Sequence, residues 1–289
     1  MKIKNINESY IYLFSSLMVV ILNFFFMDLF NREFISYVLI FFIIFFGLPH
    51  GALDTLLAKQ NGLYGGFYSF IFFNLVYLFT IVAFFFLWLS FPIISLSIFL
   101  IISIFHFSED WKLDINLFQR LILSTSLISL IIFFQTREIE SIFFILTKSN
   151  SIEKIILFFF YLSYLLLVFI AFIFFSNLKN KYLLLNIITI FLTALTLNPL
   201  LYFLCYFCFF HSIKNYRQEI SFFNIESNKV KNKILIINLF LTLFLSLVFF
   251  NFFLKDSFEQ KLIQITFIGL ASLTIPHMLL KAIINYRIK

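Results

Sequence analysis

The chain consists of long apolar runs that are separated by short polar stretches. Each run has about 17 to 24 residues, enough for an α-helix to cross the hydrocarbon core of a bilayer. Strands of a transmembrane β-barrel would be about ten residues long and would alternate between apolar and polar positions, and these runs do neither. The pattern therefore predicts an all-α, polytopic transmembrane helix bundle that forms a single domain over residues 1–289. The ten predicted spans are 10–29, 37–57, 67–89, 92–110, 116–134, 154–176, 181–197, 200–216, 233–254 and 261–284.

The seventh and eighth runs are nearly continuous, so the pattern fits eight to ten helices. Pro92 and Pro199 stand at first-turn positions, where a missing N–H costs little. The first run follows Lys2 and Lys4 and so resembles a signal peptide. It is long enough to span, and no small-residue cleavage site follows it, so we expect a retained first helix.

The basic residues of the loops predict the orientation of the bundle. With ten helices, 15 of the 21 Lys and Arg residues fall on the side of the N-terminus and six on the opposite side. Cytoplasmic loops of membrane proteins carry the excess of Lys and Arg. We therefore expect both termini on the cytoplasmic side of the inner cell membrane.

Composition excludes several classes of protein. Hydrophobic residues make up 62% of the chain, Phe alone supplies 49 residues, and only 12% are charged. Soluble domains carry about a quarter charged residues, so a water-soluble enzyme and a disordered chain are excluded. The net charge of +7 comes from residues spread between apolar runs rather than from one patch, which argues against a nucleic-acid partner. Most of the apolar surface must face membrane lipid.

The chain has only four histidines, and all lie inside predicted spans. Each is on a different helix that runs from the outer side towards the cytoplasm, about four to seven residues from the cytoplasmic end. At a rise of about 1.5 Å per residue, all four lie within about one helical turn of the same depth. A layer of imidazoles at one depth is the arrangement that a metal site in a helix bundle needs. The candidate ligands are His50, His106, His211 and His277.

Polar residues follow three of these histidines at a spacing of three or four, which on a helix returns a side chain to the same face. Asp54 and Asp110 are expected to accept the free ring N–H of a histidine, which orients the ring. Near helix ends such residues also act as interfacial charges, and this alternative stays open. The candidate supporting residues are Asp54, Glu109, Asp110 and Asn215.

The chemistry that these residues permit leaves several functions open. Imidazoles without carboxylates among the ligands suit iron, copper or zinc better than magnesium or calcium. Apolar walls favour an apolar substrate from the lipid, and iron with an open position for oxygen suits oxidation of a lipid or polyene. The alternatives are a transporter that uses the histidines and Asp54 as a proton relay, a haem-binding assembly factor, and histidines that only join helices by hydrogen bonds.

Four segments resemble the motifs of the Brp/Blh family of membrane β-carotene dioxygenases: GLPHGALD (47–54), HFSED (106–110), FHSIKN (210–215) and PHMLL (276–280). The resemblance extends over most of the chain, because the motifs run from residue 47 to residue 280 in the order of the family. It implies Fe(2+) held by histidines and cleavage of the central double bond of β-carotene by O2. The products would be two molecules of all-trans retinal, which a microbial rhodopsin could take up.

The resemblance also implies roles for individual residues. His50, His106 and His211 match family histidines that are taken as iron ligands. The family pattern has a second histidine in the third motif, where this chain has Asn215. Either His277 completes the ligand set, or three imidazoles and a water hold the iron, or the protein is an oxygenase that acts on another apolar lipid.

Overall fold

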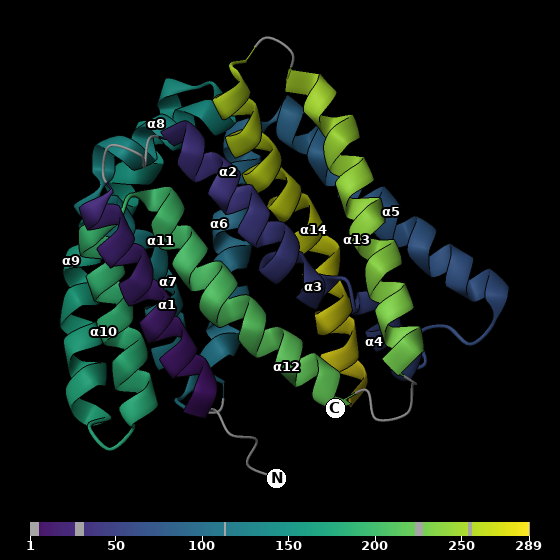
Figure 1. Ribbon diagram of the computed structural model, residues 1–289, viewed down its shortest axis with the longest axis horizontal. Helices are drawn as coiled ribbons and strands as arrows, with labels where there is room; N and C mark the ends of the chain where they lie inside the picture. Colours follow the sequence, from purple (N-terminus) through teal and green to yellow (C-terminus); the bar gives the residue numbers. More distant parts are fainter. Residues whose placement is uncertain (1–5, 27–31, 113, 223–227, 254–255, 289) are drawn as a thin grey trace.

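The computed structural model (Figure 1) describes residues 6–26, 32–112, 114–222, 228–253 and 256–288. Over these ranges the chain is almost entirely helical and contains no strand, which confirms the all-α prediction. The helices are α1 (Ile6–Phe25), α2 (Arg32–Phe42), α3 (Leu48–Gly51), α4 (Asp54–Gln60), α5 (Phe67–Ser90), α6 (Pro92–Ser108), α7 (Leu117–Phe134), α8 (Thr136–Thr147), α9 (Glu153–Ser176), α10 (Lys181–Thr196), α11 (Pro199–Tyr206), α12 (Ser212–Phe222), α13 (Asn228–Phe250) and α14 (Phe258–Ile288).

Two π-helical segments join neighbouring helices without a break. The segment η1 (Ile43–Gly47) connects α2 to α3, and η4 (Phe207–His211) connects α11 to α12. The two segments contact each other. π-helical segments inside α-helices are often found at functional sites. Here one segment ends at His211 and the other ends three residues before His50.

Local sequence explains where several helices begin. The side chains of Asn116, Asn180 and Asn198 accept hydrogen bonds from backbone N–H groups at the starts of α7, α10 and α11. An N-cap of this kind satisfies one of the backbone donors that a helix leaves unpaired at its start. Pro92 and Pro199 occupy first-turn positions, as predicted.

Each of the ten predicted runs is helical over most of its length. Seven helical stretches are long and apolar enough to cross a membrane. The run 181–197 corresponds to the shorter helix α10, and the runs 37–57 and 200–216 are interrupted by π-helical segments. The seven stretches are Glu8–Phe25, Phe67–Ser90, Pro92–Trp111, Leu117–Phe134, Asn150–Ser176, Leu235–Phe253 and Phe258–Tyr286.

The expectation of one continuous helix over residues 37–57 is wrong. The helix ends at Gly51, a turn follows at Ala52 and Leu53, and α4 begins at Asp54. Proline and glycine are poor residues for a helix interior, and both stand just before this turn. Asp54 therefore starts a new helix, where its negative charge interacts favourably with the exposed backbone N–H groups.

The short helix α8 was not expected, because twelve residues are too few to span a bilayer and three of them are charged. Its apolar side chains Ile139, Ile142 and Phe143 are buried, and α8 packs on α6, α7 and α14. The helix is amphipathic and covers one end of the bundle in the view of Figure 1.

One continuous cluster of buried apolar side chains includes residues from α1 to α14. The helices α5 and α13 lie at one edge of the molecule in Figure 1 and carry many exposed apolar side chains. Phe79 and Phe240, for example, are 73% and 70% exposed, which suits contact with lipid. The assignment of residues 1–289 to a single domain stays a prediction that the continuous core supports.

Candidate metal centre

Three of the four candidate histidines meet at the centre of the bundle. The ring centroid of His106 (α6) lies 4.5 Å from that of His211 (end of η4) and 5.2 Å from that of His277 (α14). The three side chains are at most 4% exposed. The side chain of His50 lies outside the described residues, while its backbone belongs to α3. Residues that are far apart in sequence are thus brought together, and their common depth in the membrane stays a prediction.

A carboxylate orients each of two histidine rings. His277 Nδ1 lies 2.8 and 2.9 Å from the two carboxylate oxygens of Asp54, and His211 Nδ1 lies 2.9 Å from Asp110 Oδ2. Both carboxylates are buried. An ionised carboxylate only accepts hydrogen bonds, so this geometry places a proton on Nδ1, and in a neutral ring the lone pair is then on Nε2. This is the tautomer of a histidine that binds a metal through Nε2.

A tyrosine hydroxyl donates to each of these carboxylates. Tyr77 Oη lies 2.7 Å from Asp54 Oδ2, and Tyr206 Oη lies 2.6 Å from Asp110 Oδ2. Neither tyrosine was predicted from the sequence. Their position in the middle of apolar runs was an available signal, because a buried tyrosine hydroxyl usually has a hydrogen-bond partner.

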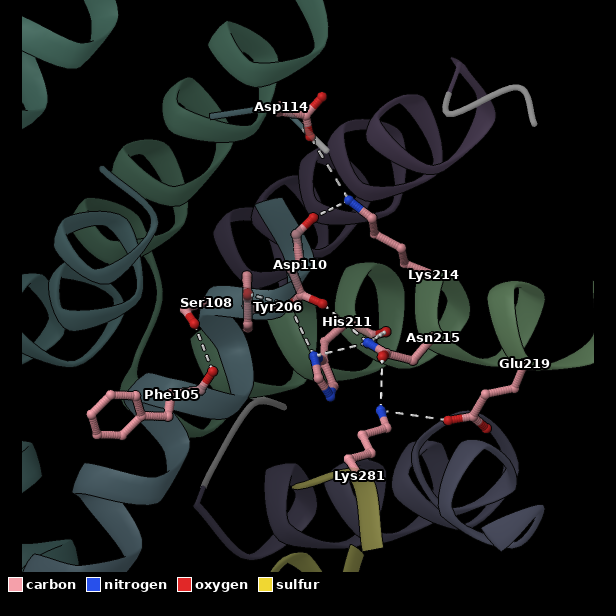
Figure 2. A network of polar contacts seen from close by, with 10 residues as sticks. All are labelled: Phe105, Ser108, Asp110, Asp114, Tyr206, His211, Lys214, Asn215, Glu219 and Lys281. Atoms are coloured by element: carbon pink, nitrogen blue, oxygen red, sulfur yellow. Dashed lines mark hydrogen bonds and ion pairs between the residues drawn. The ribbon is translucent and has the colours of Figure 1, made fainter. Parts of the chain in front are cut away.

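Asn215 links Asp110 and His211 to Lys281 through hydrogen bonds (Figure 2). Its Nδ2 atom donates to Asp110 Oδ1 at 3.0 Å and to the backbone oxygen of His211 at 2.9 Å. Its Oδ1 atom accepts a hydrogen bond from Lys281 Nζ at 3.3 Å. Lys214 donates to the backbone oxygen of Asp110. These contacts give Asn215 a supporting place beside His211.

Glu219 is a buried acid that the sequence analysis also missed. Figure 2 shows Lys281 between Asn215 and Glu219, and Lys281 Nζ lies 3.5 Å from Glu219 Oε1. Burial raises the pKa of Glu219 to about 8, although the charge of Lys281 acts in the opposite direction. One ligand atom from each of Asp54, Glu219 and His277 lies within 4.8 Å of the others. The spacing of four from His211 to Asn215 to Glu219 was the available signal.

The structure does not bring Glu109 to the histidines. The carboxylate is 40% exposed and forms ion pairs with Lys112 at 3.1 Å and with Arg120 at 3.7 Å. The α-helix ends at Ser108, and residues 109–111 form a 3-10 turn. The tighter turn changes the direction of the following side chains, so the spacing of three from His106 no longer places Glu109 on the same face.

A cavity of about 290 Å³ ends at the cluster. His106, His277 and Asp54 line it, and its other walls are mostly apolar side chains of α5, α13 and α14. Leu75 and Leu241, which also line it, are 58% and 45% exposed. Since these exposed residues lie in two apolar helices, the mouth of the cavity lies on the lipid-facing surface between α5 and α13.

The family model for β-carotene 15,15'-dioxygenase matches residues 41–285, a region that contains all the candidate site residues. The chain belongs to this family. A β-carotene 15,15'-dioxygenase of the uncultured marine bacterium 66A03 is 31% identical over 258 residues, which cover 82% of this chain and 90% of that protein. No solved structure matches the chain. The resemblance inferred from the four motifs is thereby confirmed, and with it the assignment to the oxidoreductases.

Proposed function

We propose that the protein is a membrane-embedded, Fe(2+)-dependent dioxygenase that cleaves the central double bond of β-carotene with O2 and forms two molecules of all-trans retinal. The observation that carries this proposal is the buried cluster of His106, His211 and His277 at the inner end of an apolar cavity. Membership of the chain in the family supports the choice of substrate.

The donor set of the cluster fits iron. His106, His211 and His277 offer imidazole nitrogens, and Asp54 and Asp110 hold two of the rings in the tautomer that leaves Nε2 for a metal. His50 is the fourth candidate, since its neighbours Leu48 and Gly51 both line the cavity. Bound Fe(2+) would supply a position at which O2 is activated beside the substrate.

Asn215 supports the ring of His211 rather than replacing a ligand. Its amide nitrogen donates to Asp110 and its amide oxygen accepts from Lys281, so both ends of the amide are engaged in hydrogen bonds. With Asn215 in this role, His277 completes the ligand set of the cluster.

The cavity walls bind the polyene and exclude water. Leu75, Leu241 and Leu245 provide apolar contact, and the hydroxyl of Tyr77 is hydrogen-bonded to Asp54. An apolar substrate that is dissolved in the bilayer enters between α5 and α13 without crossing water. The family substrate and O2 are both soluble in lipid, which suits this route.

Gly47 permits the packing of one wall of the cavity. A Cβ atom at this position would lie 2.7 Å from a ring carbon of Phe207, which is too close for contact. Phe207 lines the cavity, and its ring is stacked on His211 at a centroid distance of 5.5 Å. Gly47 thus lets η1 approach η4 and keeps Phe207 against the histidine.

We place the protein in the inner cell membrane with both termini in the cytoplasm. The apolar helices that could cross a membrane support the membrane location, and the excess of basic residues on one side of the ten predicted spans supports the orientation. Lipid surrounds the exposed apolar faces, and the retinal product would pass to a microbial rhodopsin.

Expression in a host that makes β-carotene tests the proposed reaction. We expect loss of the orange colour and formation of retinal, both dependent on oxygen. The control is Asn251→Ala, a polar helix residue that is exposed and far in sequence from every candidate ligand. Unchanged β-carotene in cells whose membranes contain the protein would overturn the proposal.

A further inference from the structure

A second, smaller cavity of about 110 Å³ lies against the same histidine cluster. It is lined by α6, α7, α8, α11 and α14, and the lining side chains Leu100, Ser103 and Ile131 are buried. Phe107 also lines this cavity, and its ring centroid lies 4.9 Å from that of His211. The second cavity therefore begins where the histidine cluster ends.

Two stacked aromatic rings lie between the two cavities. Phe203 lines the second cavity and Phe207 lines the first, and the two rings are stacked at 5.1 Å with an angle of 11° between their planes. On α6, His106 lines the first cavity and the adjacent Phe107 lines the second. The two cavities thus meet at the histidines, along two helices.

The walls of the second cavity contain few polar groups, and most of these are hydrogen-bonded within the protein. The hydroxyl of Tyr202 donates to the backbone oxygen of Leu127 at 2.9 Å, and the hydroxyl of Tyr206 donates to Asp110. Ser103 contributes the remaining side-chain hydroxyl in a wall that is otherwise apolar. An occupant must therefore be a hydrocarbon.

The reaction itself requires space on both sides of the histidines. β-Carotene is symmetric, and its all-trans polyene is straight and stiff. Cleavage at the central bond places the two identical halves on opposite sides of the catalytic centre. The first cavity, of about 290 Å³, has the size of a site for one drug-sized ligand, which matches one half of the substrate.

We propose that the second cavity is the subsite for the other half of the polyene, and that the stacked pair Phe203 and Phe207 forms a partition that opens to admit it. This inference rests on the proposed function. Because the two halves of the substrate are identical and the second cavity is smaller than the first, the side chains around the second cavity, including the partition, must move when substrate enters. The closed end of this subsite then sets the distance from the ring of the substrate to the bond that is cleaved.

The test is to fill the second cavity and to compare two substrates. Ser103→Leu adds bulk at its wall, and Leu100→Phe does so independently in case the first variant does not fold. Ser97→Leu is the matched control, since Ser97 lies on the same helix but not in the wall of the cavity. The substrates are β-carotene and an analogue that is truncated on one side of the central double bond.

In Ser103→Leu and Leu100→Phe we expect retinal formation from β-carotene to fall roughly 10- to 200-fold. This is the range for one methylene group in excess of what an apolar pocket can hold. The truncated analogue should be cleaved at nearly the wild-type rate, because its short side occupies the filled cavity and its full side occupies the first. Ser97→Leu should leave both rates unchanged.

Two results would overturn the subsite while leaving the proposed function intact. One is unchanged cleavage of β-carotene by folded Ser103→Leu and Leu100→Phe. The other is an equal loss with both substrates, because damage to the histidine cluster does not depend on the length of the substrate. Absence of retinal with the unmodified protein would instead overturn the proposed function, and the subsite with it.

Discussion

Two tyrosine–aspartate–histidine sets support the cluster, and they differ in their surroundings. Tyr206, Asp110 and His211 are all buried, and Asp110 also accepts a hydrogen bond from Asn215. In the other set, Tyr77, Asp54 and His277 all line the cavity that opens towards lipid. All three members of the second set therefore border the larger cavity, whereas in the first set Tyr206 borders the smaller cavity, and Asp110 and His211 line neither.

The difference predicts different roles for Asp110 and Asp54. Asp110 lies in the 3-10 turn that follows α6 and is hydrogen-bonded to α11, η4 and α12, so it stabilises the fold as well as orienting His211. Asp54 starts the short helix α4 and bonds to His277 on α14, next to Glu219. We expect the first set to respond to substitution in both stability and activity, and the second mainly in activity.

The largest expected effect is the loss of any one histidine of the cluster, whether it belongs to one of the two sets or, like His106, to neither. His106→Ala, His211→Ala and His277→Ala should each abolish retinal formation, because each removes an imidazole of the proposed iron site. Iron content of the purified variants should fall together with activity. Metal analysis and a retinal assay check this, with Asn251→Ala as the control. Activity that survived in all three variants would show that the cluster does not hold the metal.

The next largest effect is expected from substitution of the two carboxylates, and it should differ between Asp110 and Asp54. Asp110→Asn and Asp54→Asn should each lower activity roughly 10- to 100-fold, the usual cost of losing the group that orients a metal-binding histidine. Only Asp110→Asn should also lower the melting temperature in detergent clearly. Glu140→Gln is the control, because Glu140 is an exposed acid on α8, outside the histidine cluster and both cavities. Equal melting temperatures for the two variants would contradict the proposal that Asp110 contributes more to stability than Asp54 does.

Substitution of the two tyrosines should show the same difference between stability and activity, with smaller effects than substitution of the carboxylates. Tyr206→Phe removes one buried hydrogen bond to a carboxylate, worth about 1.5 to 3 kcal/mol, and should lower stability more than Tyr77→Phe does. Tyr77→Phe should act mainly on KM, because its ring lines the cavity. Thermal unfolding and steady-state kinetics measure the two effects, with the exposed Tyr161→Phe as the control. A larger stability loss in Tyr77→Phe would contradict the comparison.

The smallest effect is expected for Glu219→Gln. If the histidines hold the iron, this change should leave the iron content unchanged and lower activity only a few-fold, through the weakened pair with Lys281. Metal analysis is the decisive measurement. A loss of iron as large as in His277→Ala would instead place the metal among Asp54, Glu219 and His277, whose ligand atoms lie close together.

Much of the fold could be predicted from the sequence, because the bilayer requires long apolar helices and these are visible as runs of residues. The common depth of the histidines followed from the same counting, and His106, His211 and His277 do meet. The break between His50 and Asp54 could not be found by counting, since helical spacing holds only while the helix continues.

The partners within the site were harder to predict, because they depend on which helices pack together. Asp54 follows His50 in sequence but bonds to His277 on α14. Glu109 has the expected spacing from His106 but is turned away by the 3-10 turn. Tyr77 and Tyr206 lie far in sequence from the carboxylates that they contact, so only tertiary structure shows these pairs.

The most direct test of the central claim is metal analysis of the purified protein combined with a retinal assay on the same sample. We predict iron without haem, and two molecules of all-trans retinal for each β-carotene consumed in the presence of O2. Well-folded protein that contains iron but leaves β-carotene unchanged, or that forms retinal without bound iron, would contradict the account.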